Sequence, residues 1–92
     1  MKIFGLCQGR HEMPTDIQDY IFPMSVNPTN LSLLDETVKE KLKTETAIKL
    51  YVTGLTVALT AVLKFCFQNG IKVTLLHYNR ETKTYYEQEV IA

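Results

Sequence analysis

The chain has 92 residues, no formal net charge at pH 7, 46% hydrophobic residues and 22% charged residues. These values are typical of one small globular domain spanning residues 1–92, and they exclude a disordered chain or two domains with separate cores. With ten basic and ten acidic residues, bulk charge does not favour nonspecific binding to nucleic acid.

Both cysteines, Cys7 and Cys66, lie in apolar runs and are predicted to be buried thiols rather than parts of a disulfide framework. The start of the chain, residues 1–5, leads directly into a strand-like run without the pattern of a signal peptide. The longest apolar stretch, residues 55–67, is too short to cross a bilayer and contains Lys64. We therefore expect a cytoplasmic protein with no membrane association.

The first half of the chain predicts two strands and a helix. Residues 2–7 barely alternate in polarity, which is typical of a strand buried on both faces. Residues 19–23 are compatible with a second, short strand, in which Pro23 favours an edge position or a strand end. A helix follows that Asn30 or Ser32 can cap. Its apolar stripe, at spacings of three and four, consists of Leu31, Leu34, Val38 and Leu42.

The middle of the chain predicts a strand over residues 47–52 and a second helix over residues 55–68, which Asn69 and Gly70 end. This helix is apolar around most of its circumference, which indicates burial on more than one side. A subunit interface is expected to cover the second side, so the protein is predicted to be a homodimer. The few polar positions recur every four residues: Thr56, Thr60, Lys64 and Gln68.

The last third predicts a strand over residues 71–77, a polar turn over residues 80–83 and an antiparallel strand over residues 84–91. Strands that alternate with helices favour a parallel sheet with right-handed crossovers. The predicted fold is a minimal Rossmann-like α/β sandwich, with three parallel strands, two main helices and a C-terminal antiparallel hairpin.

Polar residues follow each predicted parallel strand. In open parallel sheets, ligands bind beyond the C-terminal ends of the strands, so these residues are expected to share one rim. The candidate ligand-binding residues are Arg10 and His11 after the first strand, Thr53, Gly54 and Thr56 after the middle strand, and His77 and Arg80 after the last.

The segment Thr53-Gly54-Leu55-Thr56 joins a strand to a helix. Glycine lets a ligand approach the free amides at the helix start, where anions are favoured, although a plain turn with a threonine cap would look the same. Arg10 and His11 suit phosphate, but a solvated loop is an equal reading. His77 is either a structural residue or, with Tyr78, Asn79 and Arg80, part of a surface that stacks on a base and binds a phosphate.

The run Leu50-Tyr51-Val52-Thr53-Gly54-Leu55-Thr56 resembles the strand, Thr-Gly turn and helix of small CRISPR-associated Rossmann-fold domains and ring-nuclease-like proteins. The resemblance implies a homodimer that meets a cyclic oligonucleotide at its interface. It also implies that Thr53, Gly54 and Thr56 lie near phosphates, with Arg10 and His11 on the same rim.

Three hypotheses remain open. The first is a dimeric module that binds a nucleotide, a cyclic oligonucleotide or another phosphate-containing ligand. The second is a metal-independent phosphodiesterase that uses His11 or His77 as general acid or base. The third is a structural or interaction protein, of phage or mobile-element type, with no small-molecule site. No cofactor is expected, and no metal, because the His, Cys and Glu residues lack ligand spacing.

Overall fold

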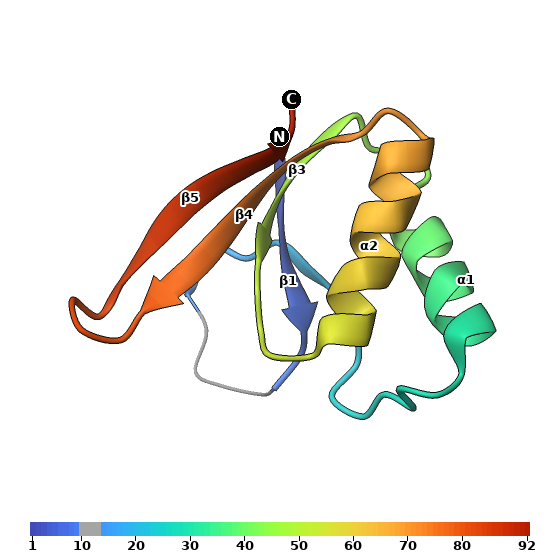
Figure 1. Cartoon of the computed structure of the whole chain (residues 1–92), viewed down its shortest axis with the longest axis horizontal. Helices are drawn as coiled ribbons and strands as arrows, with labels where there is room; N and C mark the ends of the chain where they lie inside the picture. The colour runs from blue at the N-terminus through green and yellow to red at the C-terminus, as the bar shows by residue number, and fades with distance from the viewer. Residues whose placement is uncertain (10–13) are drawn as a thin grey trace.

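A computed structural model describes residues 1–9 and 14–92 of the chain and shows one five-stranded sheet with two helices (Figure 1). The strand order across the sheet is β2-β1-β3-β4-β5. In chain order the elements are β1 (Lys2–Cys7), β2 (Asp19–Phe22), α1 (Leu31–Leu42), β3 (Ala47–Tyr51), α2 (Thr56–Gln68), β4 (Lys72–Asn79) and β5 (Thr84–Ile91).

Strands β2, β1, β3 and β4 run parallel, and β5 returns antiparallel to β4. The helices α1 and α2 connect parallel strands and lie on the same side of the sheet (Figure 1). The predicted minimal Rossmann-like fold with a C-terminal antiparallel hairpin is therefore confirmed. The short strand β2 extends the three predicted parallel strands to four and occupies an edge, as Pro23 after its last residue indicates.

The core lies between the sheet and the two helices. Side chains alternate along each strand, so one set faces the helices, and the buried residues form one apolar cluster. The sheet contributes Phe4, Leu6, Ile48, Leu50, Val73 and Leu75, and the helices contribute Leu34, Val38, Leu42, Ala58, Val62 and Cys66. Strand β1 is buried on both faces from Phe4 to Cys7, as its lack of alternation predicts.

The apolar stripe predicted for α1 holds at Leu34, Val38 and Leu42, which are all buried. Leu31 differs, because its side chain is 59% exposed. It lies in the first turn, at the mouth of a groove between the helices that Val57 and Ala61 also line. The sheet therefore does not cover this end of the stripe.

Helix α2 is covered on two sides within its own chain. Ala58, Val62 and Cys66 are buried in the core, while α1 packs along the neighbouring flank. Lys64 of α2 donates to Asp35 of α1 at 2.7 Å across this helix pair. The second cover that the sequence analysis assigned to another subunit is thus supplied by α1, and Phe67 remains 78% exposed.

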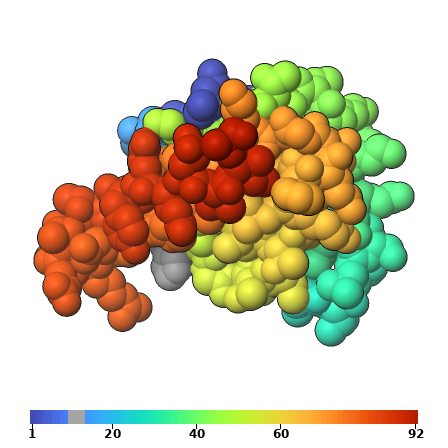
Figure 2. Space-filling model, turned by 45° about the horizontal axis from the view of Figure 1, so that its top comes forward, coloured from blue at the N-terminus to red at the C-terminus, as the bar shows by residue number. Residues whose placement is uncertain are grey.

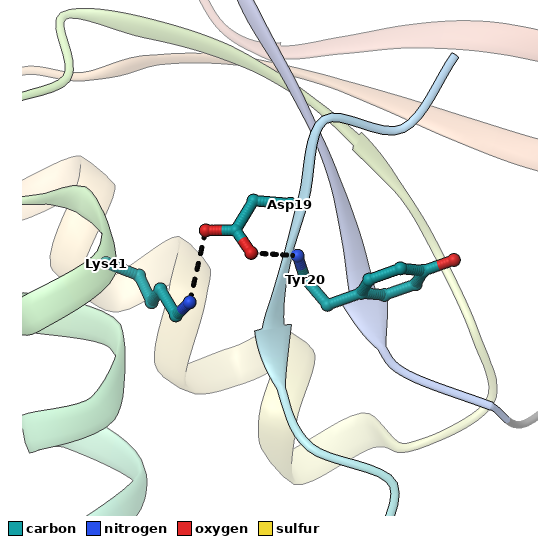
Figure 3. A network of polar contacts seen from close by, with 3 residues as sticks. All are labelled: Asp19, Tyr20 and Lys41. Carbon is teal, nitrogen blue, oxygen red and sulfur yellow. Dashed lines mark hydrogen bonds and ion pairs between the residues drawn. The ribbon is translucent and has the colours of Figure 1, made fainter. Parts of the chain in front are cut away.

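An ion pair fastens the edge strand β2 to α1 (Figure 3). Asp19 accepts a hydrogen bond from the Lys41 ammonium at 3.1 Å and another from the Tyr20 backbone amide at 2.8 Å. Burial alone would raise the pKa of the Asp19 carboxyl, but these two hydrogen bonds and the charge of Lys41 outweigh it. The pKa of Asp19 is therefore lowered, and the pair stays ionised at neutral pH.

Candidate functional site

Two of the predicted parallel strands, β1 and β3, end at a common rim. Strands β1 and β3 end at the same edge of the sheet, the lower edge in Figure 1, where α2 begins. This follows from their parallel pairing, because the C-terminal ends of parallel strands meet at one edge. Gln8 follows β1 there, and its amide donates to the Phe22 carbonyl at 3.0 Å. The next candidates along the chain, Arg10 and His11, lie outside the described residues.

The turn between β3 and α2 is tight and open to solvent. The Val52 amide donates to the Leu76 carbonyl at 3.1 Å, and the Leu55 amide donates to the Thr53 carbonyl at 2.8 Å. These bonds fix the turn against β4 and fold it around Gly54. Gly54 is exposed, and a Cβ built on it would meet no atom of the described residues within 4 Å. These residues therefore leave the space in front of this turn open.

No side chain in the described part of the chain caps the start of helix α2. Its N-cap residue is Leu55, which cannot accept from the first-turn amides, and the first turn holds no acidic residue. By contrast, Asn30 caps α1 by accepting from the Leu33 amide at 3.2 Å. The first amides of a helix have no partner inside it and carry the positive end of the helix dipole. The start of α2 is therefore suited to an anion.

Thr53, directly before this turn, has a buried hydroxyl without a partner. The residue is only 6% exposed, and among the described residues its Oγ1 atom forms no hydrogen bond. A buried polar group left unpaired costs about 1–3 kcal/mol, so such groups are rare in folded proteins. The orphaned hydroxyl is one residue from Gly54, on the segment that leads to the uncapped helix.

His77 is engaged within the hairpin. Its Nε2 atom lies 2.8 Å from Oε1 of Gln88 on β5, and its ring lies 5.3 Å from the ring of Tyr86. The side chain is partly exposed on the helix side of the sheet, in register with the start of the turn, because the neighbouring Leu76 accepts from Val52. These contacts hold His77 within the hairpin at the border of the rim.

Arg80 does not join the rim. It lies on the connection between β4 and β5, which projects to the left in Figure 1, away from the start of α2. There it lines a shallow hollow of about 500 Å³ with Tyr78, Asn79, Glu81 and Tyr86. The twist and length of the hairpin carry Arg80 away from the other candidates, which sequence position alone does not reveal.

The sheet face opposite the helices holds a tyrosine cluster that the sequence analysis did not identify. The ring of Tyr85 lies 4.8 Å from that of Tyr51 and 5.2 Å from that of Tyr78. The Tyr51 hydroxyl donates to Asp16 at 3.0 Å, from the segment before β2. In the sequence, Tyr78 and Tyr85 lie on either side of the predicted hairpin turn and could be expected to pair. Only the strand register shows that Tyr51 joins them.

Other kinds of site find little support in the part of the chain that the structure describes. No group of three or more His, Cys, Asp and Glu side chains in these residues is placed to hold a metal ion. Burial raises the pKa of the Cys66 thiol to about 11, so the group is unreactive at neutral pH. No helix in residues 1–9 and 14–92 has the length and apolar character needed to span a bilayer.

Comparison of the chain with protein-family models, with curated proteins and with solved structures finds no match.

Proposed function

We propose that this protein binds a phosphate-containing ligand, a nucleotide or a cyclic oligonucleotide, at the edge of the sheet where α2 begins. The uncapped N-terminus of α2 carries the proposal, because its free amides and dipole favour an anion. Gly54 leaves the approach open on the side of the described residues, and Thr56, which is exposed in the first turn, offers a hydroxyl to a phosphate oxygen. The Thr53 hydroxyl has no partner among the described residues, but it is buried, so it reaches a phosphate only if the turn moves.

The surroundings of the turn suit the same ligand class. Arg10 and His11 follow the end of β1 in the sequence, outside the described residues, and a guanidinium and an imidazole are groups that suit a phosphate. His77 and Tyr86 stand on the neighbouring strands, where a base can stack on the exposed tyrosine ring. We also propose that the protein works in the cytoplasm as a homodimer, in line with the resemblance to CRISPR-associated Rossmann-fold domains.

Substitution of Gly54 by Asp gives a test with opposite effects on stability and binding. The position has room for a side chain, and a carboxylate beside the helix start stabilises the dipole by about 0.3–1 kcal/mol. The same carboxylate occupies and repels the proposed anion site. We expect Gly54→Asp to raise the unfolding temperature of the free protein and to abolish ligand binding.

The binding assay is isothermal titration with inorganic phosphate, mononucleotides and cyclic oligonucleotides, at low and at physiological salt. Gly54→Ala is the matched control, because it adds only a Cβ and should leave binding within about twofold of wild type. Binding should weaken as salt rises. If Gly54→Asp binds these ligands as wild type does, the proposed site is wrong. If wild type binds none of them, the chain fits the alternative of a structural or interaction protein.

A further inference from the structure

The two edges of the described sheet differ in how they are protected. Strand β2 has four residues and is followed directly by Pro23, which cannot donate to a neighbouring strand. Strand β5 has eight residues, six of them exposed; it contains neither proline nor lysine, and its only charged residues are Glu87 and Glu89. Natural proteins normally shorten, cover or charge such an edge, because its free main-chain groups pair with other strands. The β5 edge is therefore open to a further strand.

The main-chain groups that face outward from β5 follow from the hydrogen bonds inside the sheet. The carbonyl of Leu76 accepts from the amide of Val52, which directly follows β3, so the main-chain groups of Leu76 point toward β3. Those of the next residue, His77, therefore point toward β5. Tyr86, which is opposite His77, therefore pairs with β4. The alternate residues of β5, Tyr85, Glu87 and Glu89, present their amides and carbonyls at the free edge.

An apolar surface borders this edge on the helix side. Lys64 contacts α1, and Leu59 and Leu63 lie on the flank of α2 away from it, toward β5, where both are partly buried. Phe67, three residues after Lys64, points outward to solvent. Figure 2 shows the C-terminal strand, in red, beside the second half of α2, in light orange. Phe67 is 78% exposed, Tyr86 on the same side of the sheet 55%, and Val90 42%. No helix or strand of the described residues covers this surface.

The charges along the hairpin are complementary to an antiparallel second copy of themselves. Lys83 is the turn residue directly before β5, with a φ of 54°, and Glu89 lies near the other end of the strand. Neither forms an ion pair with another described residue. Antiparallel pairing of β5 with its copy brings the turn end of each strand to the far end of the other. The free edge thus offers opposite charges where two copies would meet.

We propose that two copies of this chain pair through β5 in antiparallel register, with the two-fold axis at Tyr86, into one continuous sheet. In this register Lys83 faces Glu89 of the second copy, and Tyr85 faces its Glu87. An axis at Glu87 or Gln88 would instead oppose two glutamates, which is destabilising.

This inference rests on the proposed homodimer but not on the proposed ligand. Light scattering of the wild-type chain over micromolar concentrations should give a mass twice the 10.6 kDa of one chain. Lys83→Glu and Glu89→Lys should each raise the dissociation constant about tenfold, because each places two like-charged pairs across the axis. The double variant should restore the wild-type value within about twofold. Lys39→Glu on α1 is the control and should leave dimerisation unchanged.

A crosslink tests the register directly. Residues opposite each other in a non-hydrogen-bonded antiparallel pair have Cα atoms about 4.5 Å apart, which suits a disulfide. Tyr86→Cys should therefore form a covalent dimer on mild oxidation, whereas Tyr78→Cys, on the other strand of the hairpin, should not. The native Cys7 and Cys66 are buried and do not interfere.

The outcomes separate the two proposals. A wild-type chain that stays monomeric overturns both the homodimer and its interface. A dimer that neither single charge variant weakens, or that forms no Tyr86→Cys crosslink, overturns the β5 interface and leaves the homodimer standing. A dimer weakened by both single variants but not restored by the double variant overturns the proposed register.

Discussion

Tyr51 links Asp16, in the segment before β2, to the sheet. Its side chain is 7% exposed, its hydroxyl donates to Asp16 at 3.0 Å, and its ring meets that of Tyr85 edge to face. Burial is the main reason that the pKa of Tyr51 is raised to about 12, and the hydrogen bond to Asp16 adds to it. The hydroxyl is therefore held in its neutral form, in which it can donate.

We expect the free energy of unfolding to fall as the pH rises from about 10 to about 12. A group whose folded pKa is raised above its unfolded value, 10.0 for tyrosine, stabilises the fold fully below that value and loses this contribution as the pH passes the folded pKa. Denaturant titrations at several alkaline pH values measure the decrease. Tyr51→Phe should reduce this pH dependence, although Tyr85, whose pKa burial also raises, keeps part of it. An unchanged slope in Tyr51→Phe would contradict the assignment.

At the scale of elements, the two helices begin in opposite ways. Asn30 caps α1, and the basic residues Lys39 and Lys41 lie in its last turn, in keeping with its dipole. Helix α2 has neither a side-chain cap nor a charged residue in its end turns, and its stability comes from the core that it buries. The core packing of α2 thus compensates for its uncapped N-terminus, and the amides there are available to a ligand.

Asn30→Ala should lower the free energy of unfolding by about 1 kcal/mol, because the Leu33 amide loses its acceptor. Urea titration followed by circular dichroism measures the change. Asn30→Asp, which keeps an acceptor at the same position, is the control and should retain most of the stability. If Asn30→Ala is as stable as wild type, the hydrogen bond seen at this cap does not stabilise α1.

At the scale of the whole molecule, one apolar layer holds both helices on one side of the sheet. Leu50 lies in β3, between β1 and β4, and is fully buried in that layer. The other side of the sheet carries the tyrosine cluster and the ion pair of Lys49 with Glu87 at 2.7 Å. The two sides therefore differ in what stabilises them, and the cohesion of the fold depends on the helix side.

Leu50→Ala should lower the free energy of unfolding by about 2–5 kcal/mol, because it leaves a cavity in the centre of the core. Leu33→Ala, at a side chain that is 55% exposed, should change it by less than about 0.5 kcal/mol. Chemical denaturation of both variants at a fixed protein concentration gives the comparison. Similar losses at the two positions would show that the core does not lie where the structure puts it.

The order and type of the elements could be predicted from the sequence, because they depend on local periodicity and on turn residues. Strand β5 spans the predicted residues 84–91, and α2 begins one residue after its predicted start. The turn after β3 could be found in the same way, since a polar Thr-Gly pair between an apolar strand and an apolar helix marks the C-terminal edge of a parallel sheet. These features need no knowledge of what lies across the fold.

Only the tertiary structure decided which surfaces are free. An apolar flank is the same in sequence whether α1 or a second chain covers it, and the pairing of Lys64 with Asp35 shows that α1 covers one flank of α2 while Phe67 stays exposed. Whether a threonine hydroxyl has a hydrogen-bond partner depends on residues remote in sequence. The sequence therefore could not predict that the Thr53 hydroxyl has no partner among the described residues. Strand order and hairpin length are properties of the assembled sheet. They place Arg80 away from the rim and β5 at an edge of the sheet.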